Sequence, residues 1–279
     1  MCATCGCSEG AAGVRVIDPA ASHDHSHGHG HSHDHAHEHG HAHEHGHAHE
    51  HGQEAAAAPD PDRGHTIALE QRVLARNDEL AEHNRRWLTE RAILAVNLMS
   101  SPGAGKTTLL ERTIVDLAGE LPVSVVEGDQ ETLLDADRIT ATGCRVVQIN
   151  TGSGCHLDAE MVDRGLRALA PPARSVVFIE NVGNLVCPAL FDLGEAAKIV
   201  ITSTTEGADK PLKYPGMFAA ADLVLLNKVD LLPYLSFDVP ACLAAIRRVN
   251  PGAAVLQLSA TLGDGLAAWY DWLRDRLGS

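Results

Sequence analysis

Seven short apolar runs alternate with helix-favouring segments from residue 92 onward. The runs are rich in Val, Ile and Leu, as expected for strands that are buried on both faces of a parallel sheet. The alternation predicts an α/β domain with a mostly parallel sheet flanked by helices and with ligands at the carboxyl ends of the strands. The predicted strands are residues 92–99, 123–126, 145–149, 175–179, 198–201, 223–226 and 255–258.

A helix is predicted ahead of this domain, from Thr66 to about Arg91. Val73, Leu80 and Trp87 recur every seven positions, and the first and last of them are each followed by leucine, which gives the helix one apolar face. We expect this face to cover the core of the α/β domain, and a contact between two copies of the chain is the alternative.

The first predicted strand runs into a glycine-rich turn, Ser-Ser-Pro-Gly-Ala-Gly-Lys-Thr, at residues 100–107. This is the pattern of a P-loop, in which backbone N–H groups surround nucleotide phosphates, although serine replaces the usual first glycine. The lysine is expected to reach the β- and γ-phosphates, and the threonine hydroxyl to bind Mg²⁺. A strand, turn and helix rich in small residues, with no ligand, is the alternative. The residues assigned to the phosphates are Gly103, Ala104, Gly105, Lys106, Thr107 and Thr108.

A second nucleotide signature follows the sixth predicted strand, where Asn227, Lys228 and Asp230 form Asn-Lys-x-Asp. It resembles the guanine-recognition motif of GTPases, in which the aspartate accepts two hydrogen bonds from guanine; adenine offers no such pair of donors. Ser259 and Ala260, after the last predicted strand, match the accessory guanine-contacting loop of the same proteins. Together with the P-loop, these residues predict that the chain binds GTP and GDP.

Two carboxylates are candidates for the chemistry of GTP hydrolysis. Glu180 ends the fourth predicted strand and precedes Gly183, in the place where GTPases carry the carboxylate that orients Mg²⁺ or water and the glycine that senses the γ-phosphate. Asp129, after the second predicted strand, is the candidate for the other switch, close to Mg²⁺ and the attacking water. The expected catalytic residues are therefore Lys106, Asp129 and Glu180, with Thr107 and Asp129 as Mg²⁺ ligands. No arginine is obviously placed beside the γ-phosphate, so hydrolysis is expected to be slow.

The first 65 residues differ in composition from the rest of the chain. We divide them into a cysteine motif at residues 1–21, a histidine-rich tract at 22–52 and a linker at 53–65, which leaves 66–279 for the P-loop domain. In the cysteine motif, three thiolates and the α-amine can meet on one Ni(II), Zn(II) or Cu ion. Incidental cysteines at a frayed terminus are the alternative. The three cysteines are Cys2, Cys5 and Cys7.

The histidine-rich tract has histidine at every second position, separated by small or acidic residues. It has no apolar face to bury, so we expect it to be disordered without metal. Adjacent neutral imidazoles bind Ni, Zn, Cu and Co with little selectivity and would act as a metal store. The interleaved acidic residues disfavour an engineered tag. The histidines are His23, His25, His27, His29, His31, His33, His35, His37, His39, His41, His43, His45, His47, His49 and His51.

A second metal site is predicted within the domain, from Cys155, His156 and Cys187. Two thiols and an imidazole are a credible incomplete shell for Ni²⁺ or Zn²⁺. Because Cys187 lies four residues after Gly183, a metal held there would be displaced when GTP is hydrolysed, which would couple nucleotide state to metal affinity. A buried Cys187 acting as a small hydrophobic residue is the alternative. The remaining cysteines, Cys144 and Cys242, are expected to be structural.

Composition narrows the possible partners and the location. The formal net charge is −15, which argues against a general nucleic-acid binder because phosphate backbones need a surplus of Lys and Arg. No apolar run approaches the length of a membrane span, so we expect no membrane partner and a cytoplasmic location. In that compartment the seven cysteines are expected to be metal ligands or thiols rather than disulfides.

These motifs together resemble one family, the hydrogenase nickel-incorporation GTPases HypB, which belong to the same GTPase class as the urease accessory protein UreG. The resemblance implies a GTP-dependent homodimer that delivers nickel to the large subunit of [NiFe]-hydrogenase, working with a zinc-containing HypA-type accessory protein. Two alternatives stay open: a non-catalytic nickel store on a nucleotide-binding scaffold, and a urease accessory GTPase, whose family lacks the amino-terminal cysteine motif. Besides that motif and the histidine tract, the resemblance covers residues 77–87, 101–108, 127–129, 154–156, 180–184, 205–215 and 227–230.

Overall fold

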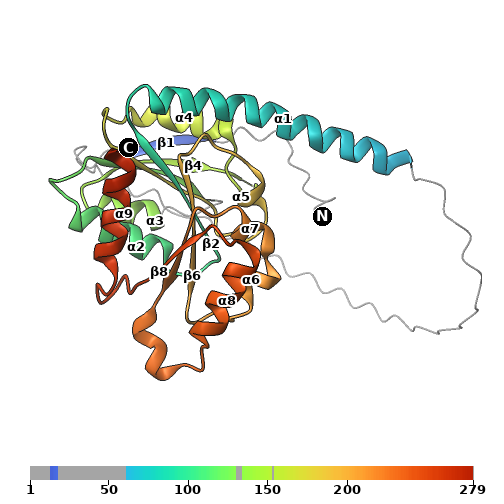
Figure 1. Ribbon diagram of the computed structural model, residues 1–279. Helices are drawn as coiled ribbons and strands as arrows, with labels where there is room; N and C mark the ends of the chain where they lie inside the picture. Colours follow the sequence, from blue (N-terminus) through green and yellow to red (C-terminus); the bar gives the residue numbers. More distant parts are fainter. Residues whose placement is uncertain (1–12, 18–60, 130–133, 153, 279) are drawn as a thin grey trace, which may run out of the picture.

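A mixed, almost entirely parallel sheet forms the centre of the computed structural model, which describes residues 13–17, 61–129, 134–152 and 154–278. Its strand order is β1-β4-β3-β5-β2-β6-β7-β8, and helices cover both of its faces (Figure 1). Neighbouring strands are parallel except at one edge, where β1 is antiparallel to β4. The strands are β1 Val14–Ile17, β2 Leu94–Ser100, β3 Val123–Asp129, β4 Arg145–Asn150, β5 Val176–Glu180, β6 Ala197–Ser203, β7 Leu223–Asn227 and β8 Ala254–Gln257.

The strands β2 to β8 overlap all seven predicted runs, and the α/β fold is confirmed. Every residue of β2, β5 and β7 is buried, because helices cover both faces of the sheet. In the part of the chain that the structure describes, no helix is both long and apolar enough to cross a membrane. The helices are α1 Pro61–Thr89, α2 Lys106–Asp116, α3 Leu134–Thr140, α4 Ala159–Leu169, α5 Cys187–Leu190, α6 Lys210–Lys213, α7 Pro215–Ala219, η1 Val229–Tyr234, α8 Val239–Val249 and α9 Leu266–Gly278.

The edge strand β1 lies in the segment where the sequence predicts only a cysteine motif. Val14 pairs with Ile149 and Ile17 with Val146, so this short strand extends the sheet beyond β4. The cysteines and histidines assigned to metal binding ahead of residue 52 fall outside the described residues, and their roles stay predictions.

The helix α1 differs from its prediction in its start and in its packed face. It begins at Pro61, so residues 61–65, assigned to the linker, are helical. Val73, expected on the packed face, is 51% exposed, since the amino-terminal half of α1 projects beyond the sheet (Figure 1). The buried positions closer to the sheet are Asn77, Ala81, Asn84 and Leu88, which follow one another at helical spacing.

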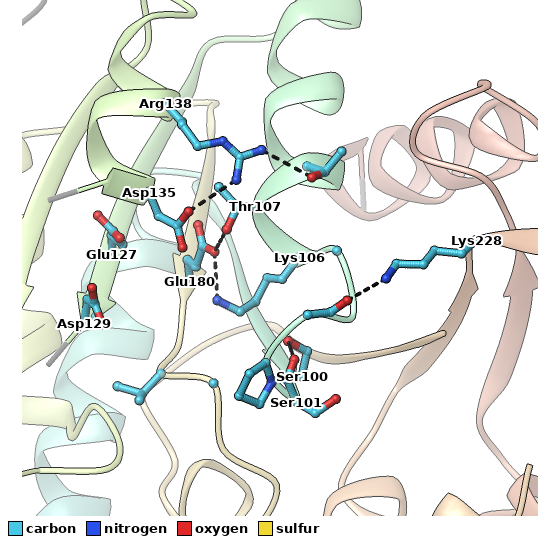
Figure 2. A pocket seen from close by; sticks show the side chains of 17 residues that line it. Ser100, Ser101, Lys106, Thr107, Glu127, Asp129, Asp135, Arg138, Glu180 and Lys228 are labelled. Atoms are coloured by element: carbon cyan, nitrogen blue, oxygen red, sulfur yellow. Dashed lines mark hydrogen bonds and ion pairs between the residues drawn. The ribbon is translucent and has the colours of Figure 1, made fainter. Parts of the chain in front are cut away.

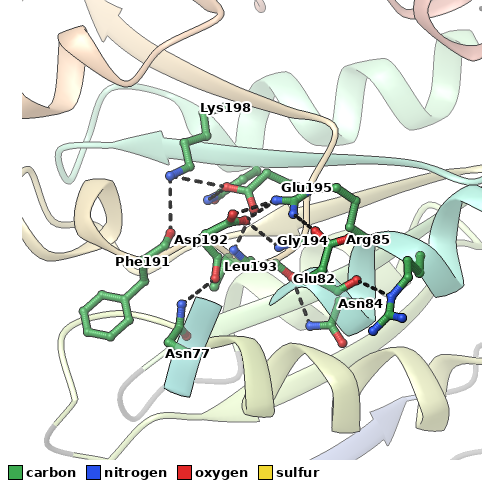
Figure 3. A network of polar contacts seen from close by, with 12 residues as sticks. Asn77, Glu82, Asn84, Arg85, Phe191, Asp192, Leu193, Gly194, Glu195 and Lys198 are labelled. Carbon is green, nitrogen blue, oxygen red and sulfur yellow. Dashed lines mark hydrogen bonds and ion pairs between the residues drawn. The ribbon is translucent and has the colours of Figure 1, made fainter. Parts of the chain in front are cut away.

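The two buried asparagines of α1 dock the helix by hydrogen bonds to backbone groups (Figure 3). Asn77 donates to the carbonyl of Asp192 at 2.7 Å and accepts from the N–H of Ala159 at 2.9 Å. Asn84 donates to the carbonyls of Ala159 and Leu193 at 2.8 and 3.0 Å. These contacts satisfy backbone groups at the start of α4 and in the loop before β6, which would otherwise be buried without partners.

The loop before β6 approaches α1 so closely that only glycine fits at position 194. Gly194 has φ +87°, and a Cβ there would lie 2.4 Å from the carbonyl oxygen of Ala81. Asp192 accepts two hydrogen bonds from Arg85 Nη2, at 2.6 and 2.7 Å. Burial acts to raise the pKa of the Asp192 carboxyl, but the hydrogen bonds from the Gly194 N–H and from Arg85 prevail and lower it. The ion pair and the glycine together fix the position of α1 on the domain.

Candidate functional site

A cavity of about 540 Å³ opens at the carboxyl ends of β2, β3 and β5, where parallel α/β sheets bind ligands. Nine residues predicted to bind nucleotide or catalyse hydrolysis line it: Gly103, Gly105, Lys106, Thr107, Thr108, Asp129, Glu180, Gly183 and Lys228. The structure thus brings the P-loop together with residues from three other strand ends. Eight further residues, which were predicted in neither role, also line it: Ser100, Ser101, Pro102, Glu127, Gly128, Asp135, Arg138 and Val182.

The P-loop has the backbone of an anion cradle. Gly103 and Gly105 have φ of +75° and +95°, which only glycine adopts without strain. The helix α2 begins at Lys106 without a side-chain cap, so the backbone N–H groups of its first turn are available to a ligand. A phosphate group fits this arrangement, because it would satisfy those donors and meet the positive end of the helix dipole.

Glu180 holds the first two residues of α2. Lys106 Nζ lies 2.7 Å from Glu180 Oε1, and the Thr107 hydroxyl donates to the same oxygen at 2.8 Å (Figure 2). The Glu180 side chain is only 1% exposed, so the lysine compensates a buried charge. A ligand with phosphates would have to draw Lys106 away from Glu180, which would then need another cationic partner.

The cavity wall opposite Lys106 is acidic, and its residues fit a divalent cation. Glu127 of β3 stands directly beside Glu180 of β5 in the parallel register, with Asp129 at the end of the same strand. One carboxylate oxygen of Glu127 and one of Glu180 are buried and have no hydrogen-bond partner among the described residues. Oxygen atoms of this kind beside the Thr107 hydroxyl suit Mg²⁺, which fits the prediction of a Mg²⁺ site here. Glu127 is a further candidate Mg²⁺ ligand, which was not predicted from the sequence.

Burial raises the pKa of the Glu127 carboxyl to about 9, with further contributions from the negative charges of Glu180, Asp135 and Asp129. Glu127→Gln is therefore expected to raise the free energy of unfolding of the ligand-free chain at pH 8 by up to about 5 kcal/mol. The folded chain keeps a proton that the unfolded chain releases near pH 4.5. The free energy of unfolding of the unchanged chain thus falls as pH rises between these values, and the gain should fade toward pH 5.

Urea unfolding at pH 5 and pH 8 measures this difference. Glu79→Gln, at an exposed position of α1, is the matched control and should change little at either pH. An equal gain for Glu127→Gln at both pH values would contradict a raised pKa at this carboxyl.

An arginine that was not predicted from the sequence lines the cavity. Arg138 of α3 donates to Glu111 at 2.6 Å, to Asp135 at 3.3 Å and to the Thr108 hydroxyl at 3.3 Å. Figure 2 shows it beside Asp135, at the end of the cavity away from Ser100 and Ser101. Arg138 was not predicted because α3 is a short helix whose direction is set by its packing and not by any local motif.

The predicted guanine-recognition residues form one hydrogen-bonded unit with the P-loop. Asn227 donates to the carbonyl of Ala104 at 3.0 Å and accepts from the N–H groups of Lys228 and Ala260 at 2.8 and 3.1 Å. Lys228 Nζ reaches the carbonyl of Gly103 at 2.7 Å (Figure 2). One buried carboxamide thus joins the P-loop, the Asn-Lys-x-Asp segment and the accessory loop.

The two remaining guanine candidates lie further from the phosphate-binding turn. Ser259 is fully buried and its hydroxyl accepts from the N–H of Leu262 at 3.0 Å, so it shapes the accessory loop. Asp230 lies half-buried in η1 and is absent from the described lining of the cavity. Its contact with guanine stays a prediction.

A buried ion pair anchors the start of the P-loop to the segment after β6. The carboxylate of Glu206 contacts both Lys210 Nζ and the Ser101 hydroxyl, and Lys210 Nζ lies 2.6 Å from that hydroxyl. Burial acts to raise the pKa of Glu206, but the hydrogen bonds from Lys210 and Ser101 prevail and lower it. The Glu206 carboxylate therefore stays charged and holds Ser101 in place.

The predicted second metal site is assembled in the structure. The ligand atoms of Cys155, His156 and Cys187 all lie within 4.8 Å of one another. The two sulfur atoms are 2.9 Å apart, and Cys155 Sγ is 3.7 Å from His156 Nδ1. Two thiols and an imidazole around one point suit Ni²⁺ or Zn²⁺, and further ligands would have to complete the shell.

The imidazole of this cluster is held in a form that binds metals. His156 stacks on Phe191 with ring centroids 3.9 Å apart, and burial lowers its pKa against the opposing charge of Asp158. A neutral imidazole is the ligand form. By contrast, burial raises the pKa of the Cys144 and Cys242 thiols to about 12 and about 11, which agrees with the structural role expected for them.

Comparison with known proteins identifies the family. A family model for the CobW/HypB/UreG nucleotide-binding domain matches residues 94–257. The hydrogenase maturation factor HypB of Rhizobium leguminosarum bv. viciae is 56% identical over 215 residues, which cover 77% of this chain and 72% of that protein. The chain belongs to the HypB family. HypB of Escherichia coli strain K12 is 54% identical over 216 residues, covering 77% of this chain and 74% of the relative.

Solved HypB structures share the fold. HypB from Archaeoglobus fulgidus superposes with a TM-score of 0.69 at 40% identity, covering 73% of this chain and 100% of that one. HypB from Helicobacter pylori, solved in complex with nickel, gives a TM-score of 0.68 at 37% identity, with 72% and 95% covered. The family's nucleotide-binding domain includes the P-loop, the Asn-Lys-x-Asp segment and the cysteine pair of this chain, since all lie within residues 94–257.

Proposed function

We propose that this HypB-family chain hydrolyses GTP to GDP and phosphate and uses the change of nucleotide to deliver nickel to the large subunit of a [NiFe]-hydrogenase. One observation carries the proposal. Gly183 packs against Pro102 of the P-loop, so closely that a Cβ added to the glycine would lie 3.3 Å from the proline ring. Four residues later, Cys187 meets Cys155. A single short segment therefore contacts both the nucleotide cavity and the metal-binding thiols.

In the nucleotide site, the proposal assigns a role to each predicted residue. Lys106 exchanges its ion pair with Glu180 for the β- and γ-phosphates of GTP. The Thr107 hydroxyl and Asp129 would hold Mg²⁺, with the Glu180 carboxylate, released from the lysine, beside them. Mg²⁺, when bound, neutralises charge on the phosphates during transfer to water. Asn227, Lys228 and Asp230 select guanine, with the loop at Ser259 and Ala260 closing against the base.

Nickel is the cargo. The histidine tract stores it, Cys2, Cys5 and Cys7 hold one ion tightly, and the cluster of Cys155, His156 and Cys187 accepts or releases an ion according to nucleotide state; zinc competes for the same thiols. The chain works in the cytoplasm as a homodimer, with a HypA-type zinc-containing accessory protein as partner. A resemblance to the family, and the nickel complex of the Helicobacter pylori relative, support these assignments.

The test compares nickel binding in two nucleotide states. In the full chain with Cys2, Cys5 and Cys7 replaced by serine, a thiolate-to-nickel absorption band reports binding at Cys155 and Cys187, since imidazoles give no such band. Free Ni²⁺ is set with a competing chelator, with GDP or with a non-hydrolysable GTP analogue present. We expect affinities that differ by about tenfold. Equal nickel affinities in the two nucleotide states would mean that the chain is a metal store on a nucleotide-binding scaffold.

A further inference from the structure

The loop that carries Cys155 and His156 is attached to the end of β3, beside the nucleotide cavity. The Thr151 N–H donates to the carbonyl of Asp129 at 2.9 Å. At the other end of the loop, the fully buried Leu157 side chain lies on Gly128, where an added Cβ would come within 2.6 Å of Leu157 Cγ. A displacement of the end of β3 would therefore reach the loop at two points.

The same loop is attached to the end of β5 through a buried carboxamide. Asn181 follows Glu180 directly and is 0% exposed. Its side-chain oxygen accepts from the N–H of Leu157 at 3.2 Å and from its own neighbour Val182 at 3.0 Å. Its amide nitrogen donates to Asn97 Oδ1 at 3.3 Å. Asn181 thus connects the segment that contacts the P-loop with the residue that follows His156.

A second, more exposed asparagine reinforces this connection. Asn184 donates to the carbonyl of Cys155 at 3.3 Å and accepts from the N–H of Val186 at 2.9 Å. Between the two asparagines lies Gly183, packed on Pro102. Both carboxamides therefore hold the Cys155 loop against residues 180–184, on the path that leads to Cys187.

We propose that Asn181 is the positioning residue that couples the nucleotide cavity to the cysteine pair, with Asn184 as its auxiliary. This inference rests on the proposed function and adds the route of its regulation. The loop carrying Cys155 lies between the ends of β3 and β5. When a γ-phosphate draws residues 180–183 toward the P-loop, the bond from Leu157 to Asn181 transmits the displacement to the loop. Without that bond, the loop that carries Cys155 keeps its position beside β3, and only Cys187 moves with residues 180–183.

The experiment measures the ratio of nickel affinities with GDP and with the GTP analogue, by the same absorption band and in the same full-length background. Asn181→Ala is expected to reduce the ratio from about tenfold to less than about threefold, while the affinity for GDP changes less than about threefold. Asn184→Ala, a milder change at a half-buried position, should give an intermediate ratio and keeps the test valid if Asn181→Ala does not fold.

The matched control is Asn250→Ala. Asn250 also donates to backbone carbonyls, those of Phe218, Ala219 and Ala221, but it touches neither site. Its loss should lower stability and leave the ratio at the value of the unchanged chain. If both Asn181→Ala and Asn184→Ala keep the ratio of nickel affinities of the unchanged chain, the coupling role is overturned and the proposed function is left intact. A ratio of one in the unchanged chain would overturn both.

Discussion

Replacing Lys106 by alanine is expected to lower the rate of GTP hydrolysis by about 10²- to 10³-fold. The ammonium group stands at the start of α2 and points into the cavity, where it lies 2.7 Å from Glu180. Its removal takes away a charge that would stabilise the phosphates in the transition state. It also leaves the Glu180 carboxylate, 1% exposed, without a compensating charge, which disfavours an anionic ligand still further.

Phosphate release at saturating GTP, with binding of a fluorescent GDP analogue followed in parallel, separates the loss of turnover from the loss of affinity. Lys213→Ala is the matched control, because Lys213 lies on the surface in an ion pair with Asp209, and it should hydrolyse GTP at the unchanged rate. If the unchanged chain and Lys106→Ala release phosphate equally slowly, the chain has no GTPase activity of its own. It is then better described as a nickel store on a nucleotide-binding scaffold.

The parallel strands were predictable because each is buried on both faces and leaves a continuous apolar run. The edge strand β1 was not, since it has four residues and pairs with β4 more than 120 positions further along the chain. Nothing local marks such a segment, and only the exposed edge of β4 selects it. Strands of this kind depend on tertiary contacts more than on propensity.

The packed face of α1 was predicted from apolar spacing, and this interpretation failed at Val73. On that helix, Asn77 and Asn84 are buried as well as Leu88. An asparagine whose carboxamide satisfies buried backbone groups packs as closely as leucine, yet it has no signal in a hydrophobic pattern. The partners of these carboxamides, at Ala159 and in the loop before β6, become known only when the chain is folded.

The residues of the candidate site likewise include some that could be predicted from the sequence and some that could not. The P-loop and the Asn-Lys-x-Asp segment are contiguous in sequence, so their spacing alone predicts them. Cys155 and Cys187 were grouped with His156 because two thiols and an imidazole form a partial metal shell, and the structure brings the two cysteines together. Glu127 stands in the segment 127–129 that carries the resemblance but was assigned no role, and Arg138 has no motif of its own. They become part of the cavity through strand register and helix packing, which single-sequence reasoning does not determine.

Gly105→Ala is expected to weaken binding of GDP by about 100-fold or more, whereas Gly103→Ala should weaken it by about tenfold. Both glycines have positive φ, so alanine strains the backbone at each by about 1 to 2 kcal/mol. Only at Gly105 does the new methyl group meet another residue: its Cβ would lie 2.5 Å from Asn227 Nδ2, while nothing lies within 4 Å of the Gly103 position.

The difference between the two variants isolates the contribution of Asn227. Its carboxamide joins the P-loop at Ala104 to Lys228 and Ala260, so displacing it separates the phosphate-binding turn from the segments expected to contact guanine. Equilibrium titration with a fluorescent GDP analogue at constant Mg²⁺ measures both affinities, and urea unfolding shows whether either variant has lost its fold. Equal losses at the two glycines would mean that backbone strain alone governs affinity. A loss confined to Gly105→Ala, in a folded chain, would mean that the P-loop and the guanine-recognition segment bind nucleotide as one unit through Asn227.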